Sequence, residues 1–463
     1  MRTVKEISEA YAAGSATPTS VTEALIARIE KLNPLLNCFI TVLKDSAMTA
    51  ARESDKRFSA GKPRGPLDGI PVAVKDLIYI EGIRCTAGSL ILKDNVANYD
   101  SPVAAKLKAA GAVLIGTTNL HEFASGATNV NPHFGPVRNP WDPERISGGS
   151  SGGSAAAVSA GLSPAAIGTD TGGSVRIPAA LCGVVGLKPT YGRISRVGVV
   201  PLASSFDTVG TLTNSVWDAA AVLGTLAGHD PLDLTTGNVP VPDYLGDLET
   251  PSTKVKVGLP ARYFMDLIDP SVRECFMKFM DGLPSQSVEV SNVELEGIER
   301  AYDVWLPIRR AEAAAFHEQW VTKTPEKYGE DVRKSLEAGL QISASRYITA
   351  QNSRPALRNA FLHSMKDVDF LAVPTTPMTA TRIGQETIDL GGTETEVYSA
   401  LVRLSLPFNA TGFPALSLPI GFSRGLPVGC QVVGKPFEEP SLLSFGHACE
   451  SRSGLFPEPK LQQ

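Results

Sequence analysis

The sequence contains few cysteines, and their spacing follows no known pattern. Only six occur in 463 residues, and no two stand at the Cys-x-x-Cys spacing of a structural zinc or iron–sulfur site. Six scattered thiols also argue against a disulfide scaffold, so we predict reduced cysteines, no metal site and a cytoplasmic location. The six are Cys38, Cys85, Cys182, Cys275, Cys430 and Cys449.

Long apolar runs and a large excess of one charge are also missing. The longest uncharged stretch, residues 146–169, is built mostly from Gly, Ser and Ala, which partition weakly into hydrocarbon. With 43 basic and 48 acidic side chains, the formal net charge is only −5. We therefore expect neither a membrane nor a nucleic acid as a partner.

The 43% of hydrophobic residues suffices for a large core, and helical and strand patterns alternate along the first third of the chain. Residues 70–75 predict a buried strand ending in Lys75. Ser20 is expected to cap a helix that runs to about Asn33. Such alternation indicates an α/β protein with a mixed, mostly parallel sheet covered by helices.

The second half begins after a Pro/Asp/Thr-rich stretch at 229–253, which is the best linker candidate. Residues 331–366 predict a long helix with a break near Pro355. Strand patterns return at 255–259, 370–373, 415–419 and 428–433. We expect these strands to join the first sheet, so that residues 1–463 form one domain.

Two Gly/Ser clusters, residues 148–154 and 171–174, lie among apolar segments rather than in polar linker sequence. Glycine there lets backbone pass close to a neighbour or to a substrate. Phosphate binding is disfavoured, because neither Gly-x-x-x-x-Gly-Lys-[Ser/Thr] nor Gly-x-Gly-x-x-Gly occurs. We conclude that both clusters are structured loops.

One alternative is the nucleophile elbow of α/β-hydrolases, because residues 148–152 match Gly-x-Ser-x-Gly. That motif follows a buried strand, whereas residues 140–145 contain two prolines and three charged side chains. The elbow also needs a histidine base, and the downstream histidines lie in helical patterns or in the linker candidate. The match is therefore weak.

A lysine can replace histidine as the base if burial keeps its amine neutral. Lys75 follows the apolar residues 70–74 and fits this role. Consecutive backbone N–H groups over residues 171–174 could converge on an oxyanion, and Gly172 and Gly173 would leave room for a substrate.

These segments together resemble the amidase signature hydrolases. The resemblance rests on residues 148–154 and 168–178, on the lysine segment 69–76, and on Asn409–Ala415 near the C-terminus. It implies an α/β/α fold with its core signature region at about 65–215. A C-terminal part at about 254–463 completes the same sheet.

By position, the resemblance makes Ser174 the nucleophile, Lys75 the base and Ser150 the proton relay, with a cis peptide bond between Gly149 and Ser150. The N–H groups of Thr171, Gly172, Gly173 and Ser174 would form the oxyanion hole, and Ala124 would lie at the acyl side. No metal and no organic cofactor are implied. Arg176 binds a substrate carboxylate in some relatives, but we favour a structural ion pair here.

The expected activity is hydrolysis of a carbon–nitrogen amide bond through an acyl-enzyme on Ser174, with esters and carbamates (urethanes) as further substrates. The partner is then a small amide or carbamate molecule, and a homodimer is one candidate assembly. The alternative is the glutaminase subunit of a tRNA-dependent amidotransferase. That subunit has an Asp seven residues before the C-terminal Asn, where this chain has Val402. An inactive scaffold on the same fold is a remote third hypothesis.

Overall fold

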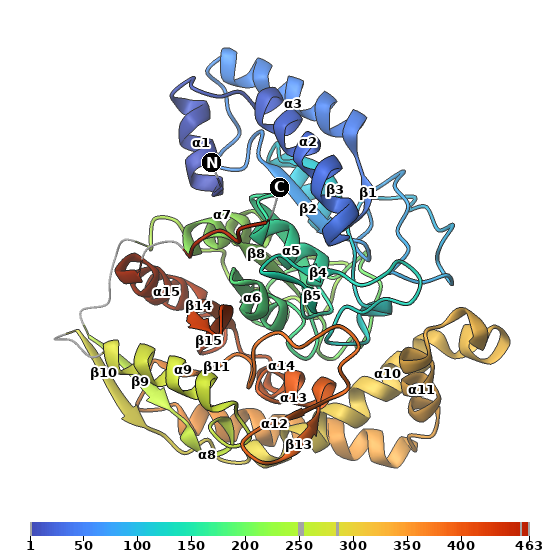
Figure 1. Cartoon of the computed structure of the whole chain (residues 1–463), viewed down its shortest axis with the longest axis vertical. Coiled ribbons are helices and arrows are strands. Elements are labelled where there is room, and N and C mark those ends of the chain that lie inside the picture. The colour runs from blue at the N-terminus through green and yellow to red at the C-terminus, as the bar shows by residue number, and fades with distance from the viewer. Residues whose placement is uncertain (1, 249–253, 284–286, 454–455, 462–463) are drawn as a thin grey trace.

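The computed structural model describes residues 2–248, 254–283, 287–453 and 456–461. Within them a mixed sheet of 11 strands runs through the molecule in the order β1-β3-β2-β6-β8-β7-β14-β15-β11-β9-β10 (Figure 1). The strands are β1 (Phe39–Val42), β2 (Pro71–Lys75), β3 (Val113–Thr118), β6 (Ala165–Asp170), β7 (Val185–Lys188), β8 (Thr208–Thr213), β9 (Val255–Leu259), β10 (Val288–Asn292), β11 (Phe370–Pro374), β14 (Ala415–Ser423) and β15 (Leu426–Val433).

Strands from the two halves of the chain meet where β7 pairs with β14. The expected mixed α/β sheet is confirmed, and the late strands do join the first sheet. Among the described strand pairs of this sheet, six are antiparallel and four parallel. The parallel share is thus smaller than expected, because β14 and β15 form a hairpin and β8 lies antiparallel between β6 and β7.

Helices cover both faces of the sheet because its strands send alternate side chains to opposite sides. In β2, Val72 and Val74 belong to one hydrophobic cluster and Ala73 to another. The first cluster takes apolar side chains from α1 (Val4–Ala12), α4 (Pro102–Ala109), α7 (Val216–Leu226), α9 (Pro270–Gly282) and α15 (Glu439–Ser453). The opposite face is covered by α2 (Pro18–Leu36), α3 (Lys44–Ser59), α5 (Gly152–Ser159) and α6 (Arg176–Cys182).

A separate hydrophobic cluster includes residues of the C-terminal strands β11, β14 and β15. Its helices include α10 (Ala301–Lys323), α12 (Ala344–Ser364), α13 (Val397–Arg403) and α14 (Leu406–Thr411). The neighbouring α11 (Glu330–Leu340) projects with α10 from one end of the molecule (Figure 1). Short elements complete the fold: α8 (Ala261–Phe264) and the two-stranded pairs β4 (Arg138–Asn139) with β5 (Asp142–Ile146), and β12 (Thr387–Asp389) with β13 (Glu394–Glu396).

Two helix boundaries differ from the sequence-based predictions. Helix α2 begins earlier than expected, because Thr17 rather than Ser20 is its N-cap, and Ser20 completes a capping box with it. The predicted break near Pro355 is wrong: Pro355 lies inside α12, and the interruption falls between Leu340 and Ala344. Packing of α12 against its neighbours outweighs the local cost of a proline in the helix.

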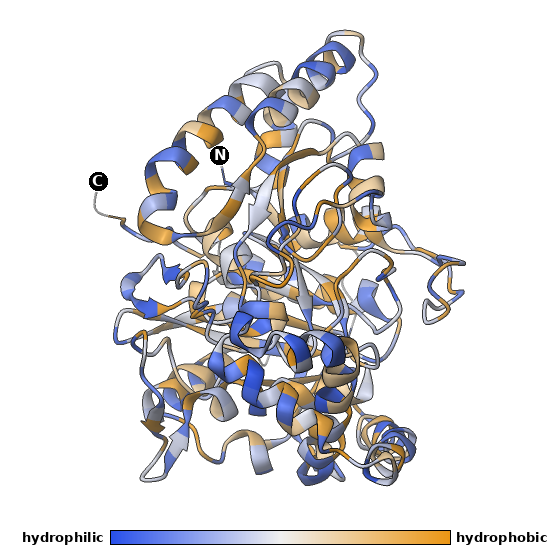
Figure 2. Ribbon diagram, turned by 90° about the vertical axis from the view of Figure 1, so that its right-hand side faces the viewer, coloured by the Kyte–Doolittle hydropathy of each residue, from blue (hydrophilic) through white to orange (hydrophobic). Residues whose placement is uncertain are grey.

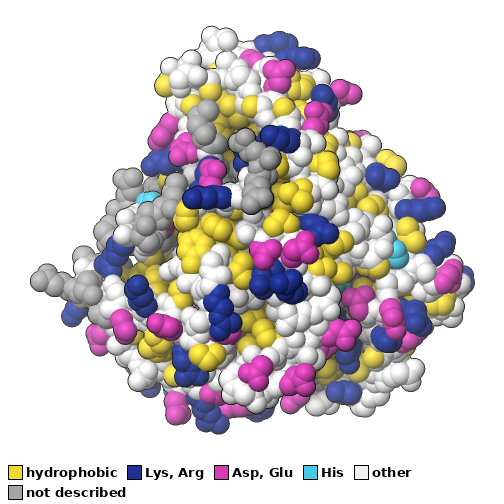
Figure 3. Space-filling model, in the orientation of Figure 1, with side chains coloured by type: hydrophobic (Ala, Val, Ile, Leu, Met, Phe, Trp, Pro, Cys, Tyr) yellow, Lys and Arg dark blue, Asp and Glu magenta, His cyan; other side chains and the backbone are white. Residues whose placement is uncertain are grey.

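The surface is mixed in character. Hydrophobic residues follow the interior strands, and hydrophilic ones the outer turns of the peripheral helices (Figure 2). Basic and acidic side chains are interspersed over the face seen in Figure 3. None of the helices in the described ranges is long and apolar enough to span a bilayer.

Candidate active site

Lys75 lies at the end of β2 in the interior of the sheet, between β3 and β6. Its side chain is fully buried, and its ammonium nitrogen reaches three hydroxyl oxygens: Ser150 Oγ at 2.8 Å, Ser151 Oγ at 2.9 Å and Thr169 Oγ1 at 3.0 Å. The apolar strand carries the lysine into the core, and the hydroxyls satisfy its polar head.

Burial decides the protonation of this amine. Desolvation lowers the pKa of Lys75 from 10.5 to about 7, although Asp170 and Asp207 attract the proton and oppose the shift. A substantial fraction of the amine is therefore neutral near neutral pH. A neutral lysine can accept a proton, as a general base must.

Ser150 and Ser174 lie on adjacent loops. The peptide bond between Gly149 and Ser150 is cis, as expected from the resemblance. The Ser151 amide donates to the Ser174 carbonyl at 3.1 Å, which joins the two loops through backbone. Ser174 keeps 7% of its surface exposed. In the described part of the chain no hydrogen bond is recorded between the two serine hydroxyls, so the Ser150–Ser174 transfer stays a prediction.

Asp170 braces the loop that carries Ser174. One carboxylate oxygen accepts the Gly173 amide at 2.8 Å, and the other accepts the Val175 amide at 3.1 Å. The Gly173 N–H donates to Asp170 in this structure, and its part in the oxyanion hole stays a prediction. Across the described residues, no acceptor is recorded for the amides of Thr171, Gly172 and Ser174. These three remain able to bind an oxyanion.

The side chain of Arg176 belongs to the framework of the site. It is fully buried, pairs with Asp170 at 2.9 Å, and donates to Gln431 Oε1 and Asn409 Oδ1, both at 2.7 Å. Burial alone would raise the pKa of Asp170, but the neighbouring Arg176 holds it well below its ordinary value of 3.8. The favoured structural ion pair is therefore confirmed.

Trp305 on α10 packs against the oxyanion loop. Its indole N–H donates to the Thr171 carbonyl at 2.9 Å, and a Cβ placed on Gly172 would lie only 2.7 Å from the ring. The Thr171 hydroxyl donates to the buried Asp207 on the other side. The close approach of an aromatic ring is therefore enough to favour glycine at position 172.

Ala124 lies in a tight segment of the loop before β4. Phe123 and Ala124 both have positive φ, 49° and 57°, and both are buried. The next residue, Ser125, accepts a hydrogen bond of 2.6 Å from the Arg309 guanidinium. The predicted position of Ala124 at the acyl side is not tested by this geometry.

Several residues of the site are not evident from the sequence. Ser151 would be expected to bind the loop or helix start, but it is a partner of Lys75, as is Thr169. In the sequence, only position points to them: Ser151 directly follows Ser150, and Thr169 lies near the end of the strand β6. Trp305 is an apolar residue that the sequence offers as a candidate for the acyl pocket, although a core position on a helix face is favoured. Arg309 gives no signal, because it lies more than 100 residues after Ser174 in an ordinary helical pattern.

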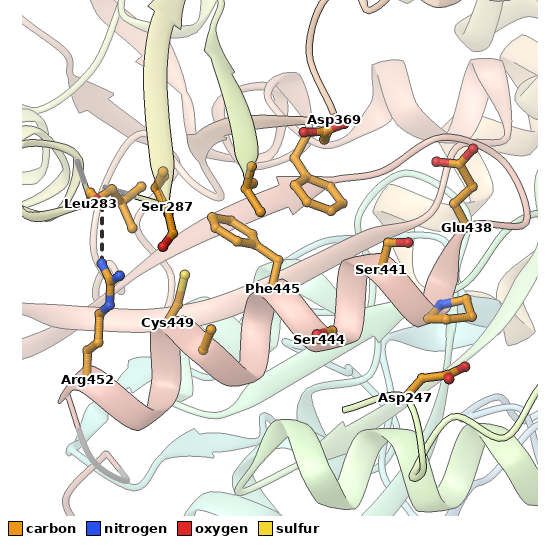
Figure 4. Close-up of a pocket in the computed structure, with 15 residues that line it drawn as sticks. Asp247, Leu283, Ser287, Asp369, Glu438, Ser441, Ser444, Phe445, Cys449 and Arg452 are labelled. Carbon is orange, nitrogen blue, oxygen red and sulfur yellow. Dashed lines mark hydrogen bonds between the residues drawn. The ribbon is translucent and has the colours of Figure 1, made fainter. Parts of the chain in front are cut away.

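A cavity of about 570 Å³ lies elsewhere, between α15 and the β9–β10 edge (Figure 4). None of the predicted catalytic residues lines it. Over the described chain, no group of three His, Cys, Asp or Glu side chains is arranged to hold a metal ion.

Comparison with known proteins agrees with this geometry. The family model described as Amidase matches residues 20–443. The chain is 39% identical to a glutamyl-tRNA(Gln) amidotransferase subunit of Geobacter sp. (strain M21), over 97% of this chain and 96% of that protein.

Solved structures superpose over nearly the full length. One comes from a vestigial protein complex described as revealing the evolutionary origins of an s-triazine catabolic enzyme; it has a TM-score of 0.94 and 33% identity, covering 98% of this chain and 99% of that one. A glutamyl-tRNA(Gln) amidotransferase subunit of Thermotoga maritima has a TM-score of 0.83 and 36% identity, covering 96% and 95%. The chain therefore belongs to the amidase family of enzymes, which act on carbon–nitrogen amide bonds.

Proposed function

We propose that this protein hydrolyses small amides through an acyl-enzyme on Ser174, with Lys75 as base and Ser150 as relay. One observation carries the proposal. The Lys75 amine is buried, has a pKa of about 7, and lies 2.8 Å from the Ser150 hydroxyl. Esters and carbamates follow the same acyl-transfer route and are further candidate substrates.

The reaction follows from the positions of these groups. Neutral Lys75 accepts the Ser150 proton while Ser150 accepts that of Ser174, whose oxygen attacks the amide carbonyl. Amides of the 171–174 loop stabilise the oxyanion, and each such donor typically contributes about 3 kcal/mol at the transition state. The proton returns to the leaving amine, and water then releases the acid. The hydrogen bond between the Ser150 and Ser174 hydroxyls, which this transfer needs, is of a kind that is often long before substrate binds.

Serine-directed labelling tests the assignment. A fluorophosphonate probe should modify wild-type protein at Ser174, and Ser174→Ala should abolish both labelling and amide turnover. Lys75→Ala should come close to this loss, and Ser150→Ala should retain more activity because one hydroxyl of a relay is easier to bypass than the base.

Ser345→Ala, at an exposed position of α12, is the matched control and should behave as wild type. Near-normal rates in Lys75→Ala would contradict the roles, and an unlabelled wild type would favour the inactive scaffold.

The second candidate is the glutaminase subunit of a tRNA-dependent amidotransferase. Relatives named as amidotransferase subunits, at 39% identity, favour it. Against it, position 402 offers a buried valine instead of a carboxylate, and the next residue, Arg403, donates to the Tyr263 and Asp266 carbonyls. Ammonia release from free glutamine, or stable co-purification with two partner subunits, would select this candidate. Turnover of other small amides by the isolated chain would select the first.

Location and assembly also stay proposals. Cys38, Cys85, Cys182, Cys275 and Cys430 form no disulfide, which suits the cytoplasmic location that we predict. Size-exclusion chromatography with light scattering would test a homodimer.

A further inference from the structure

Two arginines are buried near the proposed nucleophile, and they differ in one respect. Arg176 is neutralised by Asp170. Arg309 on α10 is only 3% exposed, yet within the described ranges no carboxylate lies at ion-pair distance from it. A buried guanidinium without a counter-ion is costly, because desolvation is not offset by an opposite charge.

The contacts of Arg309 are all neutral. Its Nη2 donates to Ser125 Oγ at 2.6 Å, and its Nη1 donates to Ser335 Oγ on α11 at 2.8 Å. The guanidinium carbon lies 5.8 Å from the centre of the Trp305 ring. Hydroxyls and a ring face hold the group in place without cancelling its charge.

These contacts place Arg309 between two walls of the proposed site. Ser125 directly follows Ala124, and Trp305 lies one helical turn before Arg309 and binds the Thr171 carbonyl. Since residues four apart lie on one helix face, α10 presents the ring and the guanidinium together. Arg309 is therefore linked to the loop that carries Ser174 through Trp305, which contacts both.

A second arginine, Arg310, directly follows Arg309 on α10. Its buried Nε has no partner recorded in the described part of the chain. Burial raises the pKa of the Tyr302 hydroxyl; Arg310 and Arg309 act to lower it, and Glu396 acts to raise it. Charges of both signs therefore act near Tyr302, so it is the burial of Arg309 without a carboxylate partner that favours an anion.

We propose that Arg309 binds a carboxylate of the substrate, so that the enzyme acts on anionic amides, such as the monoamides of short dicarboxylic acids. This inference rests on the proposed function, and it names the substrate class. The reaction adds water across the amide carbon–nitrogen bond and yields a dicarboxylate and ammonia. A planar guanidinium suits this role because it presents parallel donors to both carboxylate oxygens.

Matched substrates of equal size test the proposal. Each monoamide in the series malonamate, succinamate and glutaramate is paired with its uncharged diamide, and kcat/KM is measured for both. The wild type should prefer the anionic member of the best pair. Arg309→Met should lose about 10- to 100-fold of that preference, the range expected for a hydrogen bond to a charged group, mainly through KM. Arg309→Lys should recover part of it.

The control is Arg333→Met, which removes a half-buried arginine of α11 paired with Glu337 and should keep the wild-type preference. A measurement on the wild type alone guards against misfolded variants: succinate should slow fluorophosphonate labelling of Ser174, and succinamide at the same concentration should not. Equal rates on both members of every pair, or an unchanged preference in Arg309→Met, would overturn the inference. Wild-type protein that labels at Ser174 without this preference contradicts the anionic substrate class alone. Protein that does not label at all contradicts the proposed function as well.

Discussion

Lys75 and Lys188 have similar burial but different partners. Burial lowers the pKa of each amine to about 7. Lys188 donates to the carbonyl of Pro189, whereas Lys75 is surrounded by hydroxyls. A carbonyl only accepts a hydrogen bond, while a hydroxyl can both accept and give up a proton. The partners, and not the pKa alone, suit Lys75 to catalysis.

The pH dependence of the reaction follows from the lowered pKa of Lys75. The base acts when it is deprotonated, so kcat/KM should fall about tenfold per pH unit well below pH 7 and level off above it. Initial rates between pH 5 and 9, with circular dichroism to confirm folding, provide the measurement. A rate that declines as the pH rises through 7 would contradict a lysine base.

Gly172 offers a test of packing around the oxyanion loop. In Gly172→Ala the new methyl would lie 2.7 Å from the buried Trp305 ring, so the loop or the ring must shift. We expect a loss of about 1–3 kcal/mol in the free energy of unfolding, with slower labelling of Ser174. Chemical denaturation measures the first effect. Gly224→Ala is the control: it lies exposed on α7 with its nearest contact at 3.8 Å, and should be neutral or stabilising.

At the scale of elements, Arg176 ties the first half of the chain to the second. It begins α6, pairs with Asp170 at the end of β6, and reaches Asn409 on α14 and Gln431 on β15. Two neighbouring elements of the first half and two of the second half thereby meet behind the loop at residues 171–174. This explains why the loop geometry depends on residues near the C-terminus.

Breaking this ion pair should be strongly destabilising. Arg176→Met leaves the Asp170 charge buried and unpaired, at a cost of about 3–5 kcal/mol in the free energy of unfolding. Because the pKa of Asp170 is lowered in the folded state, its stabilisation is present above pH 3.8 and is lost as the pH falls below that value. The difference between wild type and variant, measured by urea unfolding, should therefore shrink at acid pH. An equal difference at all pH values would argue against the ion pair.

At the scale of the whole molecule, the two halves share one sheet. β7 from the first half pairs with β14 from the second, and α6 lies over both β7 and β15. Neither half can bury its sheet edge without the other. We therefore expect the chain to unfold as one unit.

Calorimetry tests this expectation. The protein should show one heat-absorption peak whose van't Hoff and calorimetric enthalpies agree. Limited proteolysis in the 229–253 segment should then leave the two fragments associated. Two resolved peaks would instead indicate separate domains.

Much of the fold, and the positions of Lys75, Ser150 and Ser174 in the candidate site, can be predicted from sequence. The apolar strand before Lys75 and the Gly/Ser clusters around Ser150 and Ser174 are local patterns, and the folded chain has a buried strand and structured loops at these positions. The position of Asp170 next to this loop also predicts a carboxylate that accepts hydrogen bonds from the loop rather than an acid, and its bonds to the Gly173 and Val175 amides confirm this. Pro355 wrongly predicts a helix break, since packing on neighbouring helices outweighs local propensity.

The sequence by itself determined most secondary elements, because these depend on neighbours along the chain, and its motifs carry the family resemblance from which the proposed relay residues are taken. The tertiary structure decided the balance of parallel and antiparallel pairing and the approach of Trp305 and Arg309 to the loops at residues 171–174 and 123–126. The approach of these two side chains arises when segments more than 100 residues apart pack together. Local periodicity carries no information about which distant side chain will face a buried loop. That the Arg309 guanidinium is buried without a carboxylate partner can likewise be seen only once the core has formed.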